Sequence, residues 1–139
     1  MKMSFWLSCV CGALLLGTGC VGTLDGRHQA GVPLVNDTVE GVYERPYEAV
    51  WQASRDTLTY NGILVVENKI GSTMEATVDT RRVWVSVDKV NANLTRVMIQ
   101  VRTKLGGTDK LLAAQLKEQI AVRLASGNTL PATPPAQAK

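Results

Sequence analysis

Apolar and polar residues alternate with a period of two through much of the second half of the chain. Residues 83–87 read Val-Trp-Val-Ser-Val, and residues 97–101 repeat the pattern as Val-Met-Ile-Gln-Val. Successive side chains of a strand point to opposite faces, so this period indicates an antiparallel sheet with one covered and one solvated face. We predict strands at residues 38–44, 63–68, 72–79, 82–89 and 95–104.

Two other segments have the period of an amphipathic helix. The first opens at Pro46 and ends before Gly62, a residue type that tolerates the left-handed turn after a helix. The second runs from an N-cap at residue 108 or 109 to about residue 125. Trp51 lies at the centre of the first apolar face, and we expect it to be buried. The two apolar stripes are Tyr47, Val50, Trp51, Ser54 and Leu58, and Leu112, Leu116, Ile120 and Leu124.

The predicted elements form one domain at residues 36–125. A chain of 139 residues suffices for a single hydrophobic core and no more. The order β-α-β-β-β-β-α predicts an α+β fold, a two-layer sandwich in which both helices cover one face of an antiparallel sheet.

Strand parity places a second group of residues opposite the valines. If the helices cover the valine face, Trp84 and Met98 lie on the open face, framed by Arg82, Arg96 and Arg102. Exposed tryptophan and arginine are frequent in binding surfaces, so these five residues are the candidate partner-binding set. The alternative is that a neighbouring hairpin, the N-terminal segment or the C-terminal tail covers Trp84.

The first twenty residues predict a secretory signal. A lysine at position 2 precedes an apolar run at residues 5–16, which is too short to span a membrane as a helix. Gly17-Thr18-Gly19-Cys20 follows and resembles a bacterial lipobox, although Gly17 stands where leucine is usual. The resemblance implies cleavage of a signal peptide, residues 1–19, and acylation of Cys20 with palmitate. Ordinary cleavage nearby and a retained hydrophobic anchor are the alternatives.

The segments on either side of the domain have no periodic pattern. Residues 20–35 contain several glycines and a proline, and we interpret them as a flexible, lipidated tether. Residues 126–139 are rich in proline and alanine and predict a disordered tail.

The sequence offers no coherent catalytic or metal-binding set. All three cysteines lie at or before position 20, and the single histidine, His28, lies in the predicted tether. Gly17 to Gly22 fits G-x-G-x-x-G but lacks the preceding strand and following helix that a dinucleotide site requires. The net charge of +3 is too small for a nucleic-acid binder. We therefore expect no catalytic residues, no metal, no cofactor and no nucleic-acid partner.

Several short motifs together resemble a known family. They are Val42-Tyr43-Glu44, the segment Pro46 to Trp51, Thr95-Arg96-Val97, Val101-Arg102 and the Gly106-Gly107-x-Asp109 turn, between a lipobox near residue 20 and a closing Leu/Ile helix. The chain resembles the bacterial lipoproteins of domain of unknown function thirty-five sixty-eight. The resemblance implies an envelope lipoprotein with no established activity and brings no catalytic residues.

We expect a non-catalytic, membrane-anchored envelope lipoprotein that acts as a small binding or assembly module. Its partners are the membrane, through lipid on Cys20, and an unidentified envelope protein or polymer. Val21 lacks the aspartate that resembles an inner-membrane retention signal, which favours the outer membrane, facing the periplasm. A periplasmic enzyme with an unrecognised site and a structural, peptidoglycan-associated lipoprotein are the alternatives.

Overall fold

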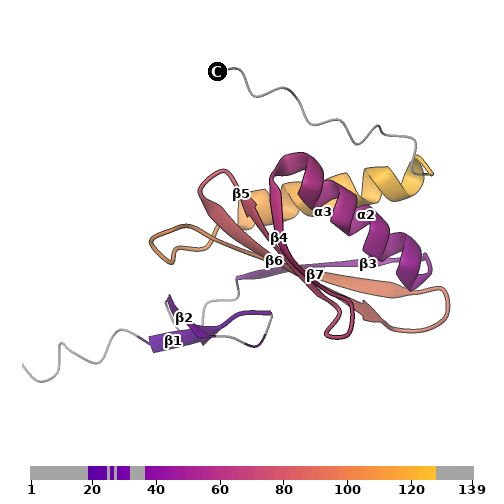
Figure 1. Cartoon of the computed structure of the whole chain (residues 1–139). Helices are drawn as coiled ribbons and strands as arrows, with labels where there is room; N and C mark the ends of the chain where they lie inside the picture. The colour runs from indigo at the N-terminus through magenta and orange to yellow at the C-terminus, as the bar shows by residue number, and fades with distance from the viewer. Residues whose placement is uncertain (1–18, 25, 27, 32–36, 128–139) are drawn as a thin grey trace, which may run out of the picture.

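The domain is built on one antiparallel sheet with two helices packed on the same face (Figure 1). The computed structural model describes residues 19–24, 26, 28–31 and 37–127. The elements of the domain are, in chain order, β3 (Thr38–Tyr43), α2 (Tyr47–Asn61), β4 (Ile63–Asn68), β5 (Thr73–Val78), β6 (Arg81–Lys89), β7 (Thr95–Arg102) and α3 (Lys110–Ala125). This order confirms the predicted β-α-β-β-β-β-α arrangement and the α+β class.

The sheet has five strands in the order β3-β7-β6-β5-β4. Strands β4 to β7 form a meander of antiparallel neighbours, and β3 pairs antiparallel with β7 at the far edge. Helix α2 therefore carries the chain from one edge of the sheet to the other. This crossing places α2 over β4, β5 and β6, while α3 covers β3 and β7.

The hydrophobic core lies between the helices and the valine face of the sheet, as predicted. The aliphatic side chains at alternate positions of β6 and β7 are fully buried there. Trp51 is only 1% exposed, and its ring stacks on Tyr47 with 5.7 Å between the centroids. Its indole Nε1 donates a hydrogen bond of 3.1 Å to Glu67 at the end of β4. The large ring of Trp51 thus joins the helix layer to the sheet, and its one polar atom is satisfied at the edge of the core.

The helix ends follow the prediction in one case and correct it in the other. Asp109 caps α3, because its carboxylate accepts a hydrogen bond of 3.0 Å from the backbone N–H of Leu112. Gly62, by contrast, is extended, with φ −172°, so the predicted left-handed turn is wrong. A Cβ at this position would lie 2.1 Å from the carbonyl oxygen of Thr77. Glycine is required here because the chain passes against the backbone of β5.

Two short strands precede the domain. β1 (Gly19–Gly22) and β2 (His28–Gly31) pair antiparallel, with Cys20 opposite Ala30. This hairpin lies on the side of the sheet away from the helices (Figure 1). The expectation of a tether without regular structure is therefore wrong for residues 20–22 and 28–31, because backbone pairing forms a hairpin without requiring an apolar period. Residues 1–18 of the predicted signal peptide, residues 32–36 and the tail after residue 127 lie outside the described residues.

Candidate binding surface on the open sheet face

The face of the sheet opposite the helices, called the open face below, carries polar and aromatic side chains in rows across the strands. One row is formed by Thr77, Arg82 and Arg102, which are direct neighbours on β5, β6 and β7. The next row contains Glu75, Trp84 and Gln100 in the same order of strands. Strand parity thus places these side chains on the predicted face.

Two of the five candidate residues are not accessible on that face. Trp84 and Arg102 are each only 2% exposed, so the expectation that they lie in an exposed patch is wrong. The guanidinium of Arg82 lies over the Trp84 ring, 5.9 Å from its centroid. The burial of Trp84 agrees with the alternative stated above, that other parts of the chain cover it. Parity along a strand determines the face to which a side chain points, but not what packs on that face.

A buried polar network joins the N-terminal hairpin to the open face. Arg102 Nη2 forms an ion pair with Asp37, and Gln100 Nε2 donates a hydrogen bond of 2.8 Å to the same carboxylate. Gln100 Oε1 accepts from the backbone N–H of Leu24 at 3.2 Å, and Gln100 Nε2 also lies 3.4 Å from the carbonyl oxygen of Gly22. Gln100 therefore joins the hairpin to β7, and Asp37 binds Gln100 and Arg102. Neither Gln100 nor Asp37 was among the predicted site residues, since an amide and a carboxylate far apart in sequence carry no local signal.

The other three candidates are partly or fully exposed but do not gather in one place. Arg82 forms an ion pair of 3.3 Å with Glu75. Arg96 lies opposite Asp88 at the other end of β6, within 3.8 Å of its carboxylate. Six residues of strand separate position 82 from position 88, a distance of about 20 Å. Met98 lies between these two ends and is half-buried. The arginines do not form a continuous frame around an exposed tryptophan.

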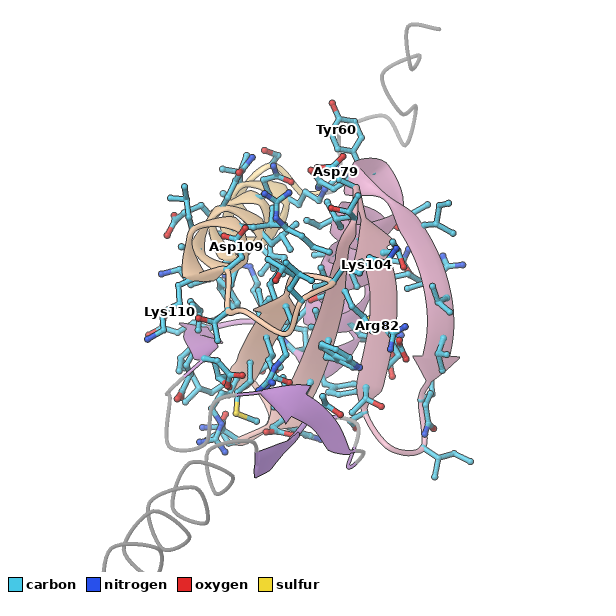
Figure 2. All side chains as sticks on the ribbon, turned by 90° about the vertical axis from the view of Figure 1, so that its left-hand side faces the viewer. Tyr60, Asp79, Arg82, Lys104, Asp109 and Lys110 are labelled. Carbon is cyan, nitrogen blue, oxygen red and sulfur yellow. The ribbon has the colours of Figure 1, made fainter. Side chains whose placement is uncertain are left out.

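A groove of about 430 Å³ opens at the Arg82 end of the sheet. Its walls come from the β5–β6 turn and from the loop that follows β7, and Figure 2 shows Arg82 and Lys104 at this end of the domain. Gly106 in that loop has φ +83°, a conformation that favours glycine. The loop is closed by a hydrogen bond of 2.8 Å from the N–H of Thr103 to the carbonyl of Gly107. The lining residues are Thr77, Thr80, Arg81, Arg82, Arg102, Thr103, Lys104, Leu105 and Gly106.

Among the described residues, two ionisable groups have shifted pKa values, and both contribute to the fold. Burial, together with the nearby Glu118 carboxylate, raises the pKa of Tyr43 to about 12. Its hydroxyl donates to the carbonyl of Lys117 at 2.9 Å and so joins β3 to α3. The hydrogen bond from Trp51 lowers the pKa of Glu67, and Arg55 at 3.1 Å adds to this effect. Within the described ranges, no group of three or more His, Cys, Asp or Glu residues could hold a metal ion.

The comparisons with known proteins identify the family. Residues 3–123 match the family described as Protein of unknown function (DUF3568). The chain belongs to this family. The match spans the hairpin and all of the domain except the last residues of α3. No curated protein matches the chain significantly. Among the helices of the described residues, none is long and apolar enough to cross a membrane.

Proposed function

We propose that this member of the family is a lipid-anchored envelope protein whose domain acts as a non-catalytic binding or assembly module. The anchor is lipid on Cys20, and the module faces the periplasm from the outer membrane. Two observations support the proposal. The first is the position of Cys20 relative to the domain, and the second is an exposed apolar edge of the sheet.

The position of Cys20 in the fold supports the proposed lipid anchor. Cys20 is the second residue of β1, and Gly22, two residues later, contacts Gln100 on the open face. Two residues of extended chain span at most about 7 Å. Lipid on Cys20 would therefore bring the open face of the sheet towards the bilayer, while α2 and α3 lie on the opposite side of the sheet (Figure 1).

Metabolic labelling tests the anchor. Cells that express the chain are fed labelled palmitate, and Cys20→Ala is compared with Cys11→Ala, a matched change inside the apolar run. Label should be lost in Cys20→Ala and retained in Cys11→Ala. Equal labelling of both variants would contradict the lipoprotein proposal. Membrane fractionation on a density gradient gives the location, and recovery in the inner-membrane fraction would contradict the outer-membrane assignment.

The exposed edge strand supports the binding part of the proposal. β4 lies at one edge of the sheet, so its outer backbone groups pair with no other strand among the described residues. Ile63 is 72% exposed, Ile70 in the following turn is fully exposed, and Val65 and Val66 are also exposed. An exposed edge with β-branched apolar side chains can add a strand from a partner. This edge is therefore a better candidate for protein contacts than the buried Trp84.

Crosslinking in cells tests the edge as a docking site. A photoreactive amino acid is introduced at Val65 and, as a matched control, at Val122, an exposed apolar position on α3. A discrete adduct from position 65 and none from position 122 supports docking along β4. Crosslinking from position 122 alone, or from neither position, contradicts it. Recovery of the protein with purified sacculi in both variants would instead favour the structural, peptidoglycan-associated alternative.

A further inference from the structure

The groove at the Arg82 end of the open face has the chemistry of an anion site. Among the described residues that line it, four are cationic, Arg81, Arg82, Arg102 and Lys104, and none is a carboxylate. Three threonines also line it. The hydroxyls of Thr77 and Thr80 make no hydrogen bond within the part of the chain that the structure describes. Each of the three arginines also pairs with a carboxylate outside this lining, Arg81 with Asp109 at 2.6 Å, Arg82 with Glu75 and Arg102 with Asp37. The groove therefore combines Lys104 and three ion-paired arginines with free hydroxyl donors.

Two arginines face each other directly across the floor of this groove. Arg82 on β6 and Arg102 on β7 are register partners in the antiparallel pair. Like charges at directly opposite positions of two strands are destabilising, and the penalty is relieved when an anion lies between them. Glu75 and Asp37 pair with the two arginines, but neither carboxylate lines the groove. The groove occupies the space between Arg82, Arg102 and Lys104.

Arg102 supplies a second, independent indication. Its side chain is buried, and within the described ranges only Nη2 has a partner, the carboxylate of Asp37. Nε and Nη1 are shielded from solvent and donate no hydrogen bond to any described residue. Buried donors without an acceptor are rare in folded proteins and costly, and each such group in a native structure calls for an explanation. An oxyanion held in the groove supplies the acceptors that these nitrogens lack.

We propose that this groove binds a phosphate group. A phosphate offers more acceptor oxygens than a carboxylate, and arginine forks match its geometry. Arg82 and Lys104 are exposed and close on the group from two walls, and the hydroxyls of Thr77 and Thr80 complete its shell. The groove, of about 430 Å³, has room for more than a bare phosphate, which fits a phosphate ester.

Direct binding of inorganic phosphate to the purified chain tests the proposal. The chain carries Cys20→Ala, so that no lipid contributes to the measurement, and binding is followed by calorimetry and by the NMR shifts of residues 103–107. We expect saturable binding that weakens about tenfold or more in Arg82→Gln with Lys104→Met. Lys89→Met is the matched control, because Lys89 is an exposed lysine at the other end of β6. Thermal unfolding checks that all variants remain folded.

A second arm separates the two sources of a phosphate ester. Vesicles of phosphatidylglycerol are compared with vesicles of phosphatidylcholine, each with and without inorganic phosphate as competitor. Groove-dependent binding to phosphatidylglycerol that phosphate reduces identifies a lipid headgroup, whereas saturation by phosphate without vesicle binding identifies a soluble ester. The proposal is overturned if phosphate does not saturate, if the groove variants bind as before, or if Lys89→Met weakens binding equally.

Discussion

Replacing Trp84 by alanine should destabilise the domain severely, although strand parity alone predicted an exposed ring. The side chain is 2% exposed in the fold. A tryptophan buries about 150–250 Å², which at about 25 cal/mol per Å² corresponds to an upper limit of about 4–6 kcal/mol. Large aromatic-to-alanine changes in cores cost about 3–5 kcal/mol, and we expect a loss of the free energy of unfolding in this range. Whole domains have only about 5–15 kcal/mol.

Urea unfolding followed by circular dichroism measures this loss. The midpoint should fall in Trp84→Ala while the slope stays near that of the wild type, since the same surface is exposed on unfolding. Trp84→Phe keeps most of the buried area and should lose much less. Arg82→Ala removes the cation over the ring, a contribution of about 0.5–1 kcal/mol at an exposed site, together with the ion pair to Glu75. A Trp84→Ala midpoint within error of the wild type would refute the burial and restore the exposed-patch hypothesis.

Three further predictions concern contacts that the sequence did not reveal. Asp37→Ala should cost about 3–5 kcal/mol in urea unfolding, because it leaves Arg102 buried without its carboxylate, and Arg102→Met in the same chain should recover part of that loss. Gly62→Ala should lower the free energy of unfolding by about 2 kcal/mol or more, because its Cβ would lie 2.1 Å from the Thr77 carbonyl, and an unchanged melting temperature would contradict this. The free energy of unfolding should fall as pH rises from about 10 to about 12, because Tyr43 ionises at a lower pH in the unfolded chain than in the folded state. In Tyr43→Phe, the free energy of unfolding measured at pH 9 and at pH 11 should differ less than in the wild type.

The sequence by itself determined the architecture of the domain. Period-two alternation located β5, β6 and β7, and a short apolar run located β4. The helical stripes identified the face that α2 buries, with Trp51 at its centre. The cap at Asp109 was also readable, because the residues that form a helix N-cap are adjacent in sequence. These features depend on neighbours a few positions apart along the chain. A single sequence contains that information directly.

Only the tertiary structure determined which side chains of the open face are buried and what they contact. The network of Asp37, Gln100 and Arg102 joins residues more than sixty positions apart. The hairpin before the domain forms by backbone pairing, and a hydrogen bond to Gln100 holds it to the sheet. Neither interaction requires a hydrophobic period, so the sequence pattern does not predict them. The reason for glycine at position 62 was likewise not predictable from the sequence, since the Thr77 backbone that would clash with a Cβ lies on β5. Parity along a strand determines the direction of each side chain, but burial depends on which distant segment packs there, and that depends on the whole fold.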